Sequence, residues 1–238
     1  MNTLSHRRAL LGRASLSLAL LGLCAAAGWT QSPGEIVAEQ KLSDTAGGFT
    51  GDLGPFDNFG TSITSLGDLN GDGVTDLAVG ASHNGDGNPL AGSVWVLFMQ
   101  ADGTVGSNVE IAPGQLGLTD LNQEHHFGAA VAFLGDLDGD GVGDLVVGAP
   151  RDDAEDAAAS KAGALWILFL NADGTVDHHT KLSDQAFGAG GPGWFDGFGT
   201  SVAALGDLDG DGAPDLAAGS PTDSQGGPEA GAVWIAFL

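Results

Sequence analysis

Dense apolar runs alternate with polar, glycine-rich stretches along most of this chain. Three such runs are Gly92–Met99, Gly163–Leu170 and Gly231–Leu238, and each contains one tryptophan and one phenylalanine among aliphatic residues. Runs this short, and this rich in β-branched and aromatic residues, are typical of strands buried on both faces. The pattern therefore predicts an all-β chain.

A longer unit surrounds each run and occurs three times. It begins with Phe-Gly, continues through an apolar stretch ending Leu-Gly-Asp-Leu, enters an acidic loop and resumes with Asp-Leu and a Gly-Ala or Gly-Ser step. The copies begin at Phe59, Phe127 and Phe198, so the period is about 70 residues. Strand-rich units at this period predict a repeat architecture in which each unit buries its apolar faces against its neighbours.

Each unit is expected to contain four strands. An Asp-Gly pair follows the dense run at Ala101–Thr104 and at Ala172–Thr175, and Asp-Gly between apolar runs is typical of a hairpin. Further strands are expected near residues 108–112 and 180–182. A tryptophan recurs at one repeat position and is interpreted as buried packing, with a sugar-stacking platform as the alternative. The three tryptophans are Trp95, Trp166 and Trp234.

The acidic loops are Asp68–Asp76, Asp136–Asp144 and Asp207–Asp215. Oxygen donors at loop positions 1, 3, 5 and 9, with a main-chain carbonyl at position 7, suit Ca²⁺, which takes ~6–8 oxygen ligands. Glycine at position 6 permits a tight curl, because it reaches positive φ without steric cost. One ion is expected per loop. The predicted ligands are Asp68, Asn70, Asp72, Val74 and Asp76 in the first loop, Asp136, Asp138, Asp140, Val142 and Asp144 in the second, and Asp207, Asp209, Asp211, Ala213 and Asp215 in the third.

An acidic turn without an ion is the alternative interpretation, and three loops in register favour calcium over it. The loop is not an EF-hand, because that motif has glutamate at position 12, where this chain has Val79, Val147 or Ala218. Asn70 stands where the other two loops have aspartate. The first loop is therefore expected to bind calcium most weakly.

The Phe-Gly starts and the Gly-Ala or Gly-Ser steps resemble FG-GAP repeats of the integrin-alpha type. The second copy carries the full signature, with Phe127-Gly128 followed by Gly148-Ala149-Pro150, whereas the first ends Gly-Ala-Ser and the third Gly-Ser-Pro. The resemblance covers residues 35–238. It implies a β-propeller whose blades are four-stranded antiparallel sheets, with calcium held in the loop between the first two strands of a blade.

The predicted fold is a β-propeller-like array of three FG-GAP repeats within residues 28–238. Residues 35–58 are expected to be an N-terminal strand segment, because Lys41–Asp44 matches Lys181–Asp184. Propellers typically have about 4–8 blades, so we expect a partial propeller that is a fragment of a longer protein. Assembly with other copies into a larger ring and a small open array are the alternatives. The repeats are residues 59–126, 127–197 and 198–238, the third truncated.

Residues 1–27 predict a secretory signal peptide. Three arginines precede the apolar stretch Ala14–Leu23, and Ala25–Ala27 supplies small residues for cleavage. Arg7 and Arg8 also resemble a twin-arginine export signal, and Cys24 is expected to leave with the signal. The protein is therefore expected to be secreted or held at the cell surface.

The charge excludes several partners. Beyond residue 27 the chain has four cations against 31 acidic residues, a net charge of −27, and no cysteine. Nucleic acid and anionic membranes favour the opposite sign, so neither is expected as a partner. No later stretch approaches the ~20 apolar residues that cross a bilayer. An exported chain without disulfides is expected to depend on metal for stability.

Catalytic motifs are absent from the sequence, which has no Gly-x-Ser-x-Gly elbow, P-loop or His-Glu-x-x-His. We therefore expect no enzyme. The pairs His125-His126 and His178-His179 are interpreted as exposed loop residues, with a zinc site as the alternative. The aromatic stretches Phe56–Phe59 and Trp194–Phe198 are interpreted as blade-to-blade packing, with a ligand-binding rim as the alternative.

Three classes of function remain. The first is an extracellular binding or adhesion module, in which the variable loops His83–Leu90, Arg151–Lys161 and Thr222–Glu229 meet a protein or glycan partner. The second is an extracellular hydrolase or lyase, or an accessory part of one. The third is a structural spacer stabilised by calcium. Fold alone does not decide among them, and the binding module is the working hypothesis.

Overall fold

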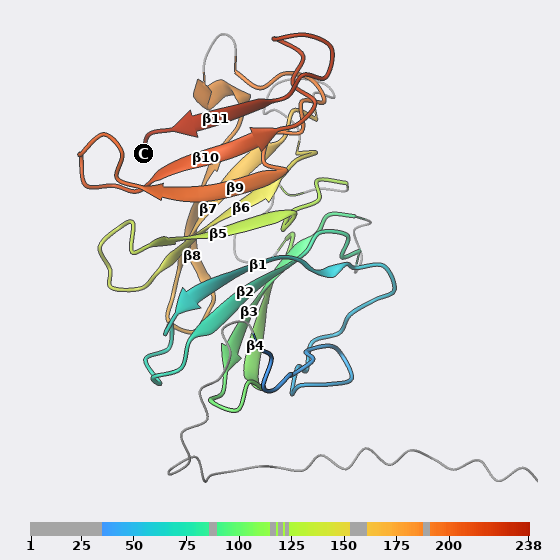
Figure 1. Ribbon diagram of the computed structural model, residues 1–238, viewed down its shortest axis with the longest axis vertical. Coiled ribbons are helices and arrows are strands. Elements are labelled where there is room, and N and C mark those ends of the chain that lie inside the picture. The colour runs from blue at the N-terminus through green and yellow to red at the C-terminus, as the bar shows by residue number, and fades with distance from the viewer. Residues whose placement is uncertain are drawn as a thin grey trace, which may run out of the picture. The chain divides into compact units, whose positions relative to one another are not determined.

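The computed structural model describes residues 35–85, 90–114, 118, 121, 124–152, 161–187 and 191–238. The expected signal peptide lies outside these residues, as does much of the variable loops Arg151–Lys161 and His83–Leu90. The chain divides into two units, Met1–Glu39 and Gln40–Leu238. Residues 35–39 have no regular secondary structure, and every described strand belongs to the second unit (Figure 1).

Regular structure in the described residues is almost entirely strand. No helix among them is long or apolar enough to cross a bilayer. The first blade contains β1 (Phe59–Gly67), β2 (Asp76–Ala81), β3 (Ser93–Met99) and β4 (Val105–Ile111). The second contains β5 (Ala130–Gly135), β6 (Asp144–Ala149), β7 (Ala164–Leu170) and β8 (Val176–Leu182), followed by the short 3₁₀ helix η1 (Asp184–Phe187). The third contains β9 (Ser201–Gly206), β10 (Asp215–Ser220) and β11 (Ala232–Ala236).

Neighbouring strands pair antiparallel in three sheets, ordered β1-β2-β3-β4, β5-β6-β7-β8 and β9-β10-β11. The dense apolar runs form the third strand of each sheet, and each acidic loop joins the first strand to the second. The predicted fold class, an all-β array of antiparallel blades forming a partial propeller, is confirmed. The third sheet has three strands in the described residues.

The blades pack face to face, with β1 beside β5 and β5 beside β9 (Figure 1). Side chains along the third strands alternate between two faces, as in any strand. Val94 and Val96 of β3 share one core cluster with Trp166 of β7, and Ile167 on the opposite face of β7 shares the next cluster with Trp234 of β11. Trp166 is completely buried. The packing interpretation of the repeated tryptophan is therefore confirmed.

The glycines of the repeat signature lie where two blades meet. A Cβ atom on Gly80, at the end of β2, would overlap the carbonyl oxygen of Gly128 in the next repeat, and one on Gly148 would overlap that of Gly199. Gly128 also donates its amide to the Gly148 carbonyl at 3.1 Å. The close approach of the two backbones leaves no room for a side chain, so the signature glycines set the spacing between blades.

The strand expected at Lys41–Asp44 is not formed. The segment turns instead, with only an isolated bridge, and Phe49 packs edge-on against Trp95 with ring centroids 5.0 Å apart. β4 already occupies the fourth position of the first sheet, and the amide of Val105 in β4 donates to the Gly47 carbonyl at 2.8 Å. The N-terminal segment therefore covers an apolar face of the first blade instead of extending a sheet.

Candidate functional site

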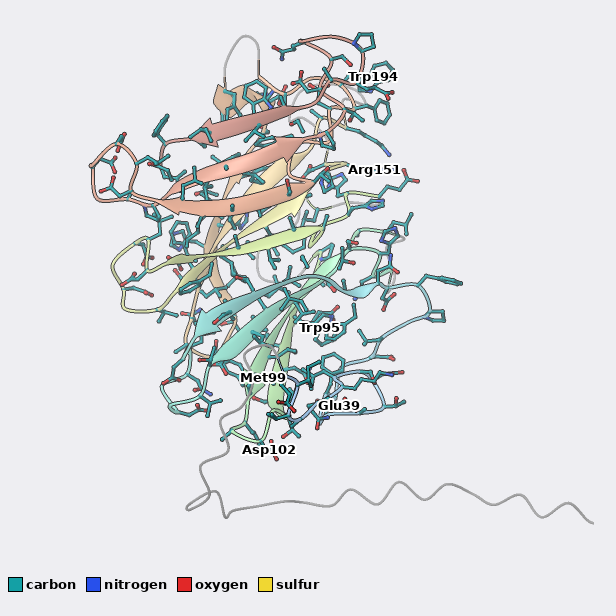
Figure 2. All side chains as sticks on the ribbon, in the orientation of Figure 1. Glu39, Trp95, Met99, Asp102, Arg151 and Trp194 are labelled. Atoms are coloured by element: carbon teal, nitrogen blue, oxygen red, sulfur yellow. The ribbon has the colours of Figure 1, made fainter. Side chains whose placement is uncertain are left out.

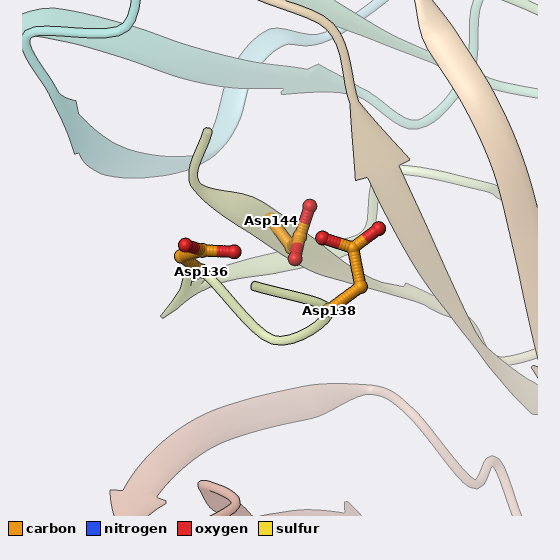
Figure 3. Close-up of side chains that lie close together, drawn as sticks. All are labelled: Asp136, Asp138 and Asp144. Carbon is orange, nitrogen blue, oxygen red and sulfur yellow. The ribbon is translucent and has the colours of Figure 1, made fainter. Parts of the chain in front are cut away.

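The second acidic loop brings three carboxylates together at the tip of its blade (Figure 3). The loop leaves β5 at Gly135 and enters β6 at Asp144. Asp136, Asp138 and Asp144 each offer an oxygen within 4.8 Å of the other two. Carboxylate oxygens are the hard donors that Ca²⁺ binds at about 2.3–2.6 Å. Three of the predicted ligand positions, 1, 3 and 9, thus lie close together.

Backbone amides hold this loop in its curled shape. Asp136 accepts hydrogen bonds from the amides of Gly139 at 2.7 Å and Gly141 at 2.9 Å, and Asp140 accepts one from Val142 at 2.7 Å. Gly141, at position 6, has a φ of 91°, in the left-handed region that favours glycine. The curl expected from this glycine is present, and the loop itself fixes its carboxylates.

The aspartate at position 9 also holds the blade together. Asp144 is 1% exposed and accepts amide hydrogen bonds from Leu137 at 2.8 Å and Leu170 at 3.1 Å. Burial raises the pKa of Asp144, and these two hydrogen bonds oppose the rise. Asp76 and Asp215, both fully buried, accept the corresponding pairs of amides in the other blades. Asp76 and Asp144 thus link an acidic loop to the third strand of the blade, and Asp215 links its loop to Leu238, two residues beyond β11.

The third loop also brings three carboxylates together, at loop positions 1, 3 and 5 where the group of the second loop is at positions 1, 3 and 9. Asp207, Asp209 and Asp211 each offer an oxygen within 4.8 Å of the other two. In the first loop, Asn70 donates its side-chain amide to a carboxylate oxygen of Asp72 at 3.0 Å. An aspartate in place of Asn70 would leave that oxygen available to a cation. This contact is a physical basis for the expectation that the first loop binds calcium most weakly.

Four polar side chains form a buried network next to the second blade. Asp152 is completely buried and accepts hydrogen bonds from the indole of Trp166 and the ammonium of Lys181, both at 2.8 Å. His125, 2% exposed, places Nδ1 3.3 Å from the same carboxylate. Burial raises the pKa of Asp152, while His125 and Lys181 oppose the rise. The interpretation of His125 as an exposed loop residue is therefore wrong, because this charge network draws it inward.

The second histidine pair lies on β8, not in a loop. His178 stacks on Phe169 with ring centroids 4.0 Å apart, and His179 lies 5.1 Å from the ring of Trp166. In the described part of the chain, the groups of three metal-ligating side chains are those of the second and third acidic loops. The alternative of a zinc site built from the two histidine pairs is not formed there.

The opposite ends of the sheets carry a cavity of about 470 Å³ between the second and third repeats. Arg151 lines it from the loop after β6, and Trp194 and Phe195 line it from the turn before β9. Figure 2 shows Arg151 and Trp194 on the same edge of the sheets. Trp194 is 68% exposed and Phe195 52% exposed. The packing interpretation is wrong for these two residues, whereas Phe198, completely buried, does pack between blades.

Sequence reasoning missed two aspartates that shape the exposed turns. Asp57 and Asp196 each precede a Phe-Gly step by two residues and are each 6% exposed. Each accepts the backbone amide three residues before it, at 2.6 and 2.5 Å respectively. The turns hold the neighbouring Phe56 and Phe195 outward, Phe56 being 87% exposed, so the packing interpretation is wrong for Phe56 as well. Asp57 and Asp196 both lie two residues before a Phe-Gly step, and this repeated position was the sequence signal that could have identified them.

Each blade is an antiparallel sheet with its own acidic loop and with the glycines of the Phe-Gly and Gly-Ala or Gly-Ser steps. This combination defines a class of proteins that are built from repeated blades. Comparison with known families identifies the class more closely, since the FG-GAP repeat matches residues 59–97, 127–168 and 198–235. The chain belongs to the FG-GAP repeat family. The resemblance to the integrin-alpha type is confirmed.

Two kinds of relative illustrate the match. Integrin alpha-5 of Xenopus laevis is 33% identical over 168 residues, which cover 68% of this chain and 14% of that protein. Integrin alpha-IIb of Homo sapiens is 34% identical over 167 residues, covering 68% and 14%. Phosphatidylinositol-glycan-specific phospholipase D of Bos taurus is 32% identical over 182 residues, covering 75% and 20%. The chain spans a fifth or less of each of these relatives.

Proposed function

We propose that this protein is a calcium-stabilised extracellular binding module and not an enzyme. The observation that carries the proposal is the convergence of Asp136, Asp138 and Asp144 within 4.8 Å, with a second group of three carboxylates, Asp207, Asp209 and Asp211, in the third loop. A site made only of oxygen donors suits a hard cation and not a soft transition metal. In this proposal each loop holds one ion through positions 1, 3, 5 and 9 and the carbonyl at position 7.

The residues fit such an ion. Bound calcium would supply the positive charge that offsets repulsion among the loop carboxylates. Asp136 and Asp140 are held by amides of their own loop, so ion binding requires little rearrangement of them. Asp144 connects the loop to Leu170 of β7. Ordering the loop is therefore expected to stabilise the first three strands of the blade together.

Binding is proposed for the opposite ends of the sheets, where loops vary between repeats. The cavity beside Trp194 and Phe195 lies there, and exposed aromatics on a rigid scaffold are typical of recognition surfaces. The partner is proposed to be a protein or glycan outside the cell, in line with export by the expected signal peptide. Nucleic acid and anionic membranes are disfavoured by the net charge of −27 beyond residue 27, four cations against 31 acidic residues.

Thermal unfolding of the chain across a calcium titration tests the proposal, with magnesium and EDTA as controls. We expect calcium to raise the melting temperature selectively, because ligands that bind only the folded state stabilise it. The double variant Asp138→Asn/Asp209→Asn removes one carboxylate from each of the second and third loops and should reduce the rise. A cooperatively folded chain whose melting temperature does not respond to calcium would contradict the proposal.

An extracellular hydrolase carried on the propeller is the second candidate, because one relative is a phosphatidylinositol-glycan-specific phospholipase D. Incubation of the chain with a phosphatidylinositol-glycan substrate distinguishes the two candidates. The binding module is expected to leave the substrate intact. Hydrolysis of the substrate by the purified chain would favour the second candidate.

A further inference from the structure

The cavity between the second and third repeats is large enough for a small ligand. Its volume of about 470 Å³ falls within the ~300–1,000 Å³ of small-molecule pockets. It combines aromatic rings, hydroxyl groups and charges of both signs on one concave surface. The lining includes Arg151, Lys161, Trp194, Phe195, Thr222 and Glu229.

A turn fixed by hydrogen bonds holds the rings of Trp194 and Phe195 outward. Phe195 has a φ of 59°, an unfavourable conformation for a bulky residue. Thr222 Oγ1 donates to the Phe195 carbonyl at 2.6 Å, and Asp196 accepts the amide of Gly193 at 2.5 Å, so both sides of the turn are fixed. The rings of Trp194 and Phe195 lie 5.0 Å apart at 43°. The fold thus keeps a large apolar surface in water at a fixed place, which marks a contact surface for a ligand.

The cations of this acidic chain gather at the same cavity. Only four basic residues follow residue 27, and two of them, Arg151 and Lys161, line the cavity. Lys161 forms an ion pair with Glu124 at 2.5 Å. Arg151 is exposed. Its guanidinium makes no hydrogen bond or ion pair with another described residue, and the carboxylate of Glu124 is close enough to interact with it electrostatically. An exposed guanidinium can bind an anion through two parallel N–H donors.

The other lining groups favour a hydroxylated ligand of low charge. Glu229 and the side-chain oxygens of Thr222 and Ser224 can accept hydrogen bonds from ligand hydroxyls. The same carboxylate, together with the net negative charge of the chain, opposes a ligand with several acidic groups. The flat apolar face of a ring can lie on Trp194. An acidic peptide would satisfy Arg151 and would be repelled by Glu229.

We propose that this cavity binds an oligosaccharide carrying a single acidic sugar. The sugar carboxylate pairs with the guanidinium of Arg151, the apolar face of a sugar ring lies on Trp194, and Glu229 accepts hydroxyl hydrogen bonds. This inference names the ligand class of the binding face proposed above and rests on that proposal.

The test measures binding of three probes to the calcium-saturated chain by titration calorimetry and saturation-transfer NMR. The probes are a disaccharide with one glucuronic acid, its neutral glucose counterpart and an N-acetylated triaspartate peptide. We expect the acidic disaccharide to bind about tenfold or more tightly than the neutral one, because a charge-assisted bidentate pair is lost in the latter. Arg151→Gln should abolish that preference, and Trp194→Ala should weaken binding of both sugars.

Two variants outside the cavity provide matched controls. Phe56→Ala removes the exposed aromatic at the corresponding turn of the first repeat, and Lys41→Gln removes another of the four cations. Both should leave sugar binding unchanged. Equal affinity for the two sugars, no effect of Arg151→Gln, or tighter binding of the peptide would each overturn the inference. If calcium still raises the melting temperature but the chain binds neither sugar, the proposal of a calcium-stabilised module stands and the proposed ligand class is wrong.

Discussion

The carboxylate of Asp144 accepts a hydrogen bond from the backbone amide of Leu170 at 3.1 Å. This contact joins the end of the second acidic loop to the end of β7, the third strand of its blade. Asp76 bonds the amide of Met99 at 2.9 Å in the first blade, and Asp215 that of Leu238 in the third. The loops proposed to bind calcium are thus hydrogen-bonded to the strands of their blades. Substitutions in these loops should therefore have two separable effects, one on the stability of the blade and one on calcium binding.

Asp144→Asn is expected to destabilise the protein with or without calcium. An amide has one acceptor oxygen where the carboxylate has two, so a buried backbone donor loses its partner at a cost of about 1–3 kcal/mol. Asp140→Asn keeps the acceptor for Val142 and should lower stability only when calcium is present. Urea unfolding of both variants in calcium and in EDTA measures the difference. Identical losses for both variants in EDTA would contradict the structural role of Asp144.

Asn70→Asp is expected to strengthen the first loop. The substitution adds a carboxylate and removes the side-chain amide that now bonds Asp72 at 3.0 Å. Site-resolved NMR titration follows the amides of Gly73, Gly141 and Gly212, which occupy the matching position of the three loops. It should show the first loop filling last in the original chain. In Asn70→Asp it should fill together with the second. Filling of the first loop before the others in the original chain would contradict the prediction.

The repeated parts of the molecule were predictable from sequence, and the exceptions lie where repeats differ. The period, the strands and the buried Trp166 followed from apolar spacing, because every copy makes the same contacts with its neighbours. The turn at Lys41–Asp44 was not predictable, since local similarity to a strand does not show whether a partner edge is available. The burial of His125 was also missed, because it depends on Asp152, which is distant in sequence and carries no motif.

His126 is expected to make stability fall as the solution becomes acidic. Burial, with His83 4.7 Å away ring to ring and Arg151 nearby, lowers the pKa of His126 to about 4. The unfolded chain has the ordinary value near 6.5, so between these values the unfolded state binds more protons than the folded state. The free energy of unfolding therefore decreases as pH falls from about 6.5 toward 4, and is unaffected by this group above that range.

Urea unfolding at pH 7.5 and pH 5, with calcium saturating at both, measures this effect. His126→Gln should lose less stability between the two pH values than the original chain does. His178→Gln, at a half-exposed position of β8, is measured in parallel as the control for removing a histidine side chain. An equal pH dependence in the original chain and His126→Gln would contradict the prediction.

Ile167 and Ile235 occupy the same position of the third strand in consecutive blades, with very different burial. Ile167 is 3% exposed between two blades, and Ile235 is 43% exposed on the far face of the third. Ile167→Ala should lower the free energy of unfolding by about 2–5 kcal/mol. Ile235→Ala should lower it by less than about 1 kcal/mol, since surface changes have small effects. Urea unfolding of the two variants compares them directly, and equal losses would show that a further layer covers Ile235 in solution.

Self-association is expected through that exposed face of the third blade. Val233 and Ile235 of β11, and Phe237 directly after it, are 72%, 43% and 60% exposed and alternate along the chain. The matching residues of the second blade pack against the third blade. A continuous apolar face of this kind promotes association. Light scattering over a concentration series should give an apparent mass that rises with concentration. Phe237→Asp should bring it to the monomer value while leaving the melting temperature nearly unchanged, and a monomer at every concentration in the original chain would contradict the prediction.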